Sequence, residues 1–345
     1  MKKIIYIMLI LVTILILENS YKLYETDILK ITNITENTTV TKTNSLGIKE
    51  KYYLQNIKGK ILQNNKKILI KNQYGESEVM SEKYSVGDEL FIKDGEIISL
   101  RRDKYLYYTI LLLVITLIYI YKQRGINSVI SIISNITIFI TGLLIYKIID
   151  NIIILSIYYL ILFPVTSLLI TNKINRKTIL ALISTMISVL VITIILLIIT
   201  KLTNYNAINF NELEYIIKNY EEIYLFSLIL GTLGVIMDIC VTITSSLFEI
   251  KEKNKNITNK ELMKSGKNIG SDIIITMSNV IFFTFLSSCL PSFILQLRNK
   301  VTLINYLQTN FSVELSRFLV GTIGILLSIL ISSYITIKAG DKKWI

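Results

Sequence analysis

The sequence has no histidine and only two cysteines and two prolines in 345 residues. Without an imidazole, the chain has no Ser-His-Asp or Cys-His nucleophile, no histidine-ligated zinc site and no HExxH protease motif. Cys240 and Cys289 both fall within long apolar segments, and we interpret them as small apolar residues rather than as a disulfide or a metal pair. No ATP-binding motif is present either. We therefore expect a protein that is not an enzyme and that carries no cofactor and no metal.

Long apolar segments account for most of the chain. Hydrophobic residues make up 52% of it, and beyond residue 104 they are gathered into seven runs, at about 105–121, 126–148, 152–170, 178–200, 223–248, 271–295 and 316–338. Each run is near the roughly 20 residues that a helix needs to cross a bilayer, and only helices satisfy the backbone there. With a further apolar run at residues 4–17, the sequence predicts about eight membrane-spanning helices in a lipid bilayer.

Three regions follow from this pattern. Residues 1–20 form an N-terminal membrane anchor; a cleaved signal peptide is the alternative, but no small-x-small cleavage site follows the apolar run. Residues 21–104 are polar, and turn signals such as Val86-Gly87-Asp88 and Asp94-Gly95 separate short alternating stretches, which is typical of a small OB-like or SH3-like β domain. Residues 105–345 form a seven-helix transmembrane bundle. The predicted fold class is an all-α polytopic membrane helical bundle with a small extracytoplasmic β-rich domain.

Lysine and arginine are distributed unequally between the short connections. If the N-terminus lies inside, sixteen occupy the cytoplasmic pieces: Lys2, Lys3, Lys122, Arg124, Lys173, Arg176, Lys177, Lys251, Lys253, Lys255, Lys260, Lys264, Lys267, Lys338, Lys342 and Lys343. Only five occupy the opposite short connections: Lys147, Lys201, Lys218, Arg298 and Lys300. The positive-inside rule then places both termini in the cytoplasm and residues 21–104 outside. This topology also accounts for the net charge of +12, so we expect no nucleic-acid partner.

The segment 223–248 contains Asp238, the only carboxylate deep inside an apolar run. An ionised carboxylate at mid-membrane costs about 2.5–3.5 kcal/mol on insertion scales, so Asp238 must be protonated, paired or hydrated. We interpret it as a functional residue; the alternative is a neutral acid hydrogen-bonded to a neighbouring helix. Helical spacing places six residues on its face: Gly231, Gly234, Asp238, Thr242, Ser245 and Glu249.

The segment 271–295 carries a second polar face, formed by Asp272, Thr276, Asn279 and Ser287. We expect the two faces to lie against each other or to line a water-filled cavity. Asn279 is the best companion for Asp238, because the two are within reach in depth and an amide both donates and accepts hydrogen bonds. The hypothetical site for a solute or ion is completed by Thr242, Ser245, Thr276, Asp272 and Glu249. Asp272 and Glu249 lie near the helix ends, where they form either a vestibule for cations or simply solvated acids.

Two further groups of polar residues have simpler interpretations. Glu314 and Arg317 are three residues apart on one helix face, and we expect them to form a structural pair or a gate at the outer interface. Ser184, Thr185 and Ser188 lie within the segment 178–200, where small hydroxyl residues usually serve helix packing.

The polar faces also carry a resemblance. The order of residues resembles the bacterial YibE/F-like membrane protein family through Gly231, Gly234, Asp238, Ser245, Ser246, Glu249, Ser265-Gly266, Ile269-Gly270, Asp272, Thr276-Met277, Asn279, Leu290-Pro291, Glu314, Arg317, Gly321 and Gly324. The chain departs from the family pattern at Thr171–Asn175, where a glycine is expected, and at Ser271, where a basic residue is expected. The resemblance implies an N-terminal anchor, a small β domain and a multi-pass bundle, but no defined activity.

Two functions are compatible with these features. The first is a transporter or permease for a small solute or ion, with Asp238 and Asn279 as ligands near the middle of the membrane. The second is a non-transporting scaffold whose outer β domain binds an envelope protein. An intramembrane enzyme is a weaker third hypothesis, because no GxGD signature accompanies Asp238 and no histidine can activate a serine.

Overall fold

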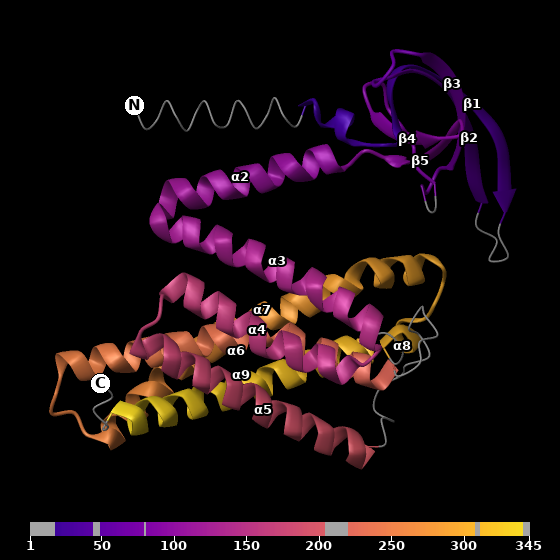
Figure 1. Cartoon of the computed structure of the whole chain (residues 1–345). Helices are drawn as coiled ribbons and strands as arrows, with labels where there is room; N and C mark the ends of the chain where they lie inside the picture. Colours follow the sequence, from indigo (N-terminus) through magenta and orange to yellow (C-terminus); the bar gives the residue numbers. More distant parts are fainter. Residues whose placement is uncertain (1–17, 44–48, 79–80, 204–219, 308–310, 341–345) are drawn as a thin grey trace, which may run out of the picture. The chain divides into compact units, whose positions relative to one another are not determined.

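The computed structural model describes residues 18–43, 49–78, 81–203, 220–307 and 311–340. The chain divides into two compact units, residues 1–116 and 117–345. The first contains a β domain and most of the first long helix, and the second contains the remaining helices (Figure 1).

The β domain is a single antiparallel sheet of five strands: β1 (Asp27–Thr43), β2 (Lys49–Ile61), β3 (Lys67–Gly75), β4 (Glu89–Lys93) and β5 (Glu96–Leu100). A short 3₁₀ helix, η1 (Ser20–Leu23), precedes them. The strand order is β3-β2-β1-β4-β5, and the sheet curls into a half-barrel (Figure 1). The predicted Asp94-Gly95 turn joins β4 to β5 with positive φ at both residues, 54° and 86°, as a two-residue hairpin requires.

The core of this domain consists of the buried side chains that alternate with more exposed ones along the strands. On β2 the residues from Gln55 to Ile61 alternate between buried and more exposed, and the buried ones meet residues from β1, β3 and β4. The core consists of Leu29, Ile31, Ile57, Ile61, Ile70, Tyr84, Leu90 and Ile92. A partly open five-stranded barrel of this kind is what OB-type domains use to fill a small interior with side chains.

Arg101 connects the sheet to the first long helix. Its side chain is 1% exposed and lies 2.7 Å from Glu89 on β4 and 3.3 Å from Asp103, and it donates a hydrogen bond to Ser20 at 2.6 Å. Tyr24 also donates to Asp103, and this bond raises the pKa of Tyr24 to about 12. The sequence analysis missed this network, because its members lie far apart in the sequence, from Ser20 to Asp103. The buried guanidinium, paired with two carboxylates, thus connects η1, β4 and the start of the first long helix.

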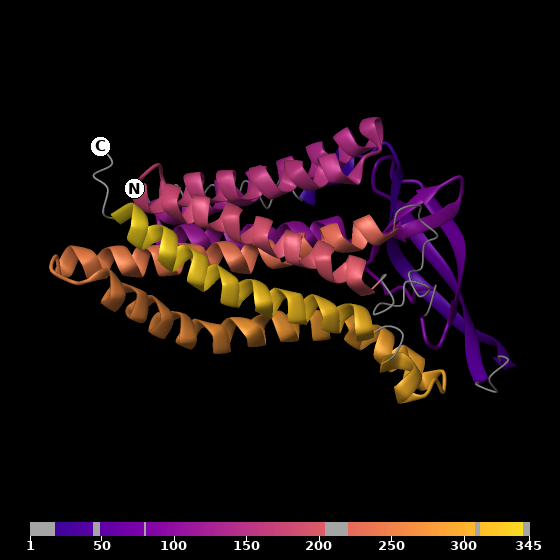
Figure 2. The same ribbon diagram turned by 90° about the horizontal axis from the view of Figure 1, so that it is seen from below.

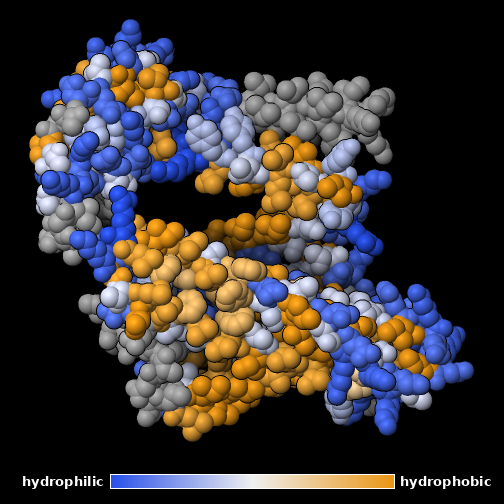
Figure 3. Space-filling model, turned by 180° about the vertical axis from the view of Figure 1, so that it is seen from behind, coloured by the Kyte–Doolittle hydropathy of each residue, from blue (hydrophilic) through white to orange (hydrophobic). Residues whose placement is uncertain are grey.

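Seven helices in the described part of the chain are long and apolar enough to cross a membrane. They are α2 (Asp103–Tyr121), α3 (Gln123–Ile149), α4 (Ile152–Asn172), α5 (Arg176–Thr203), α6 (Tyr220–Lys253), α7 (Asn259–Arg298) and α9 (Ser312–Gly340). Apolar side chains cover much of the helical surface (Figure 3). The protein is therefore a multi-pass membrane protein, and the predicted helical membrane bundle with a small β domain is confirmed; the extracytoplasmic position of that domain stays a prediction. The anchor predicted at residues 1–17 falls outside the described residues.

The main departure from the predicted spans is in α7. The helix begins at Asn259, twelve residues before the expected 271, because Thr258 and Glu261 form a capping box that starts it inside the lysine-rich connection. Pro291 lies inside this helix, which continues through it to Arg298. A four-residue helix, α8 (Leu303–Tyr306), then leads towards α9.

Helix α9 lies against α5, α6 and α7 and runs along the bundle beside them (Figure 2). Glycines let the helices approach: a Cβ on Gly321 would lie 3.0 Å from Ile281 and 3.1 Å from Thr232, and one on Gly324 would lie 3.0 Å from Ile192. Close backbone approach through small residues is the usual means of packing helices in lipid.

Tyr159 joins α3, α4 and α6. Its ring stacks on Phe163 at 5.1 Å and on Phe226 at 5.8 Å, and its hydroxyl donates to the carbonyl of Phe139 at 2.7 Å. Gly142 leaves the space for the ring, since a Cβ there would lie 2.5 Å from it. The buried hydroxyl is thus satisfied, which lets a tyrosine occupy an apolar interface.

Glu36 on β1 makes the β domain sensitive to acid. Tyr74 donates to its carboxylate at 2.7 Å and Lys83 lies 3.4 Å away, and the bond from Tyr74 holds the pKa of Glu36 below its usual 4.5. Because this pKa is lower in the folded state, ionised Glu36 stabilises the domain above about pH 4.5. That contribution is lost as the pH falls through the folded value.

We therefore expect Glu36→Gln to destabilise the β domain by about 1 kcal/mol at pH 7 and to weaken the pH dependence of its stability below pH 4.5. Hydrogen exchange of β1 and β2 in the full-length protein, corrected for intrinsic rates, measures both. The control is Glu76→Gln, at an exposed position. Identical pH dependence in Glu36→Gln and the parent protein contradicts the assignment.

The packing of α7 on α9 gives a second prediction. A Cβ on Gly270 would lie 2.4 Å from Cγ2 of Ile329, and a β-branched side chain in a helix cannot rotate away. Gly270→Ala is expected to destabilise the bundle by about 1–3 kcal/mol, measured as a lower thermal midpoint in detergent. Ser271→Thr adds a methyl group at the neighbouring exposed position and serves as the control. Equal midpoints for the two variants would show that α7 does not pack on α9 in this way.

Candidate functional site

The polar face of α6 lies on the outside of the helical unit. Asp238, Thr242, Glu249, Gly231 and Gly234 are all exposed, and Ser245 is half-buried. The opposite face of α6 is buried among its neighbours, with Ile236, Ile239, Cys240, Ile243 and Thr244 at most 1% exposed. The helix therefore buries its apolar face and presents its polar one outward, the reverse of what a lipid environment favours.

The polar face of α7 is also outside. Asp272, Thr276 and Asn279 are exposed, and the opposite face of the helix contacts α9 and α6 through Gly266, Gly270 and Ile281. The two faces belong to neighbouring helices, since α6 and α7 contact each other.

The side chain of Asp238 makes no hydrogen bond or ion pair with any residue that the structure describes. The same holds for Asn279 within the described ranges, so a single chain does not join the two residues expected to be companions. The hydroxyl of Thr242 donates to the backbone carbonyl of Asp238 at 2.8 Å, and that of Thr276 to the carbonyl of Ile273 at 2.9 Å. No described residue of the same chain therefore occupies a hydrogen-bonding position of the Asp238 carboxyl group.

Two contacts define the relative depth of α6 and α7. Thr232 and Ile281 both meet the Cβ position of Gly321, and Leu247 lies 3.5 Å from the Cβ position of Gly266. In each case the residue numbers on α6 and α7 add to 513, as expected of two antiparallel helices.

Asp238 is consequently level with residue 275, beside Thr276. Asn279 is level with Gly234, about four residues or 6 Å further along the axis. Thr276 is thus nearer in depth to Asp238 than Asn279 is.

The interior of the bundle contains hydroxyl groups whose arrangement the sequence analysis did not foresee. Ser184 and Ser188 on α5, and Ser328 and Ser332 on α9, are fully buried. The contact of Ile192 with Gly324 places Ser184 level with Ser332 and Ser188 level with Ser328. The four-residue spacing of these serines on both helices is the feature of the sequence that could have predicted the contact. It fits the packing role expected of small residues in membrane helices.

Both cysteines are free and buried. Cys240 belongs to the apolar core between α5 and α6, where its sulfur lies 3.9 Å from the hydroxyl of Ser188. Among the residues that the structure describes, no group of three or more His, Cys, Asp and Glu side chains lies close enough to hold a metal ion.

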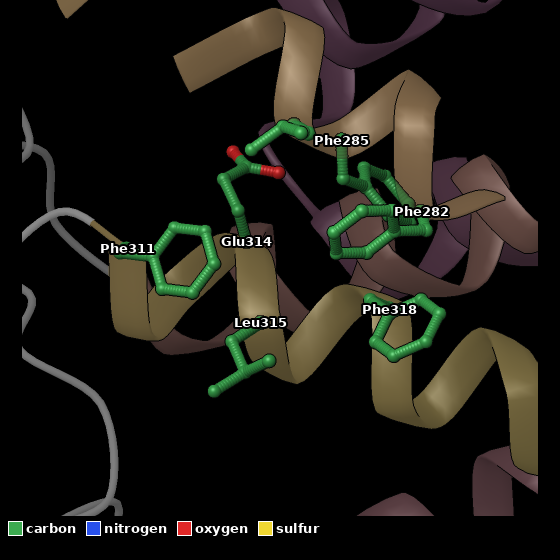
Figure 4. A pocket seen from close by; sticks show the side chains of 7 residues that line it. Phe282, Phe285, Phe311, Glu314, Leu315 and Phe318 are labelled. Carbon is green, nitrogen blue, oxygen red and sulfur yellow. The ribbon is translucent and has the colours of Figure 1, made fainter. Parts of the chain in front are cut away.

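Glu314 and Arg317 form an ion pair at the start of α9. Arg317 donates to one carboxylate oxygen of Glu314 at 2.7 Å and to the hydroxyl of Ser227 on α6 at 3.2 Å. Glu314 also lines a small pocket of about 10 Å³, the lower limit for one water molecule, together with Phe282, Phe285, Leu286, Phe311, Leu315 and Phe318 (Figure 4). The pair links α9 to α6, which suits either a structural or a gating role.

The pair is testable by a double-mutant cycle. Glu314→Gln leaves the half-buried Arg317 without its counter-charge and is expected to destabilise the bundle by about 1–3 kcal/mol. The double variant Glu314→Gln, Arg317→Gln is expected to lose less than the sum of the single variants. Thermal unfolding of the three variants in detergent measures the coupling. Strictly additive losses would mean that the two side chains do not interact.

The deeper part of the outward face carries acids. Asp238 and Asp272 lie there with hydroxyl and amide groups around them, and Glu249 lies further along α6, where the exposed Lys264 of α7 is at the same depth. Oxygen ligands with negative charge suit hard cations and protons rather than anions.

Comparison with known families covers nearly the whole chain. A model of the YibE/F-like protein family matches residues 109–341, and a model of the YibE/F family N-terminal domain matches residues 22–102. Neither a curated protein nor a solved structure matches the chain.

Proposed function

This multi-pass membrane protein belongs to the YibE/F-like family, and we propose that it transports a small cation or proton across the bilayer, with Asp238 as the central ligand. One observation carries the proposal. Asp238 lies deep within α6, and its carboxyl group has no partner among the described residues. An ionisable residue at this depth marks a transport or proton pathway by default.

The surrounding residues support a cation rather than another solute. Asp272 and Glu249 add negative charge towards one end of the same face, and Thr242, Ser245, Thr276 and Asn279 add oxygen ligands along it. The distribution of lysine and arginine favours a cytoplasmic position for this end of the face, and we propose that the protein lies in the cytoplasmic membrane of a bacterium with both termini inside and the β domain outside. Glu314 and Arg317 then lie at the outer end, where a gate would act.

The test is ion flux in proteoliposomes that contain the full-length protein. A pH-sensitive dye inside the vesicles reports proton movement when gradients of Na⁺, K⁺ or H⁺ are applied in turn; for the Na⁺ and K⁺ gradients the flux is also measured with a protonophore present, so that uncoupled cation movement drives a proton counterflow. Asp238→Asn is expected to abolish the flux at unchanged incorporation, because an amide keeps the size of the side chain but carries neither charge nor an exchangeable acid proton.

Thr284→Val is the matched control, since it removes an exposed hydroxyl of α7 that does not belong to the polar face. It is expected to leave the flux intact. Flux that persists in Asp238→Asn, or that is absent from the parent protein under every gradient, refutes transport by this route.

A second candidate function is a scaffold whose outer domain binds an envelope protein. Strand β1 favours it, because its pairing with β2 extends to Thr43 whereas its pairing with β4 covers only Asp27–Lys30. Much of one edge of β1 thus has no partner strand within the described domain, and such edges accept an added strand. If the scaffold function is right, deleting residues 22–104 removes the effect of the protein on the cell, and Asp238→Asn leaves that effect unchanged. If the transport function is right, Asp238→Asn removes it.

A further inference from the structure

We infer that the polar face of α6 and α7 is an interface between two copies of this chain, related by a two-fold axis along the membrane normal. The inference holds whatever the bundle transports. It starts from the exposed residues of the two helices: Gly231, Gly234, Asp238, Thr242, Glu249, Lys264, Asp272, Thr276 and Asn279. In a bilayer this face cannot remain against lipid, because acyl chains offer no hydrogen-bonding partner to a carboxyl or amide group.

The occupant follows from how the two faces match in depth. The contacts that align α6 with α7 relate residues whose numbers add to 513. Under this relation Glu249 is level with Lys264, an acid with a base. Thr242 is one residue from the level of Asp272, and Asp238 is one residue from the level of Thr276, so each of these two carboxyl groups has a hydroxyl group at its own depth that can accept a hydrogen bond from the protonated acid.

The fourth match is steric. Asn279 is level with Gly234, where a Cβ would have no atom of the described chain within 4 Å. The open space over Gly234 accepts a side chain from outside, and glycine permits close approach of a second helix.

A two-fold axis along the membrane normal converts these matches into contacts. Such an axis leaves the depth of every residue unchanged, and an isologous interface makes each contact twice. Helix α6 of one copy then faces α7 of the other, so that Glu249 meets the second copy's lysine and Asp238 meets its threonine. Within one chain both faces point outward, and the same pairs do not close.

The arrangement makes the site incomplete in a single chain. Asp238, Thr242 and Ser245 come from one copy, and Asp272, Thr276 and Asn279 from the other. The carboxyl group of Asp238 then lies between protomers, away from lipid.

The test is cross-linking between two differently tagged full-length chains co-expressed in membranes, both carrying Cys240→Ala and Cys289→Ala. One chain carries Thr242→Cys and the other Asp272→Cys; a second pair is Gly234→Cys with Asn279→Cys. Mild oxidation is expected to give a covalent dimer that bears both tags. The control pair, Leu326→Cys with Ile194→Cys, lies on exposed apolar surface and is expected to give none.

A charge exchange tests the same surface without new cysteines. Glu249→Lys alone and Lys264→Glu alone are expected to weaken dimerisation in vesicles by about ninefold each, because a lost polar contact between membrane helices costs about threefold and the two-fold interface loses it twice. The double variant is expected to restore it. Single-molecule photobleaching of labelled full-length protein measures the dimer fraction.

Three results overturn the inference. The first is a protein that is monomeric in bilayers, with the face covered by another part of the same chain. The second is a control pair that cross-links as well as the interface pairs do. The third is cross-linking of the interface cysteines to a different protein. A dimer that forms through these positions but shows no flux supports the interface and refutes only the transport proposal.

Discussion

The structure depends on the inability of lipid to hydrogen-bond with protein. Seven helices long enough to span a bilayer must satisfy their polar groups within the protein, and most do. Thr185, Thr200 and Ser332 donate to carbonyls of their own helices, and buried Tyr159 donates to a carbonyl of the neighbouring helix. Against this background, the outward carboxyl group of Asp238 has no hydrogen-bond partner among the residues that the structure describes, and the proposed function and the proposed interface both derive from it.

Helix α9 is what allows α6 and α7 to turn their polar faces outward. It contacts α5, α6 and α7, and the glycines at 321 and 324 bring it close enough to bury the apolar faces of its neighbours. Buried serines at four-residue intervals lie on both helices where α5 contacts α9. The bundle therefore excludes charge from its centre, and Arg176 and Arg317, which lie near the helix ends, hold α9 to its neighbours: Arg176 donates to the carbonyl of Ala339, and Arg317 to Ser227 on α6.

The sequence predicted the fold class well because the signals for membrane helices are strong and local. All seven spans predicted after residue 104 are present, and the β domain has the expected turn at Asp94-Gly95. It placed the start of α7 wrongly, because a capping box of two polar residues extends the helix beyond its apolar part. It also missed the Arg101 network, whose members are separated by up to 83 residues in sequence, from Ser20 to Asp103.

The candidate site was only partly predictable. Helical periodicity identified which residues share a face on α6 and on α7, but not whether a face points inward or outward. That depends on which neighbour buries the opposite side. The depth of Asn279 relative to Asp238 likewise depends on the register between helices, which only contacts such as that of Leu247 with Gly266 define.

The most direct test of this account is the infrared signature of Asp238 in the full-length protein in bilayers, isolated by isotope labelling and by subtraction of Asp238→Asn. The account predicts a carboxyl band that titrates with the pH of the medium and shifts when the transported cation is added, because the group lies in a hydrated site between helices. A band that stays protonated at every pH and responds to no cation would contradict it and would make Asp238 a packing residue.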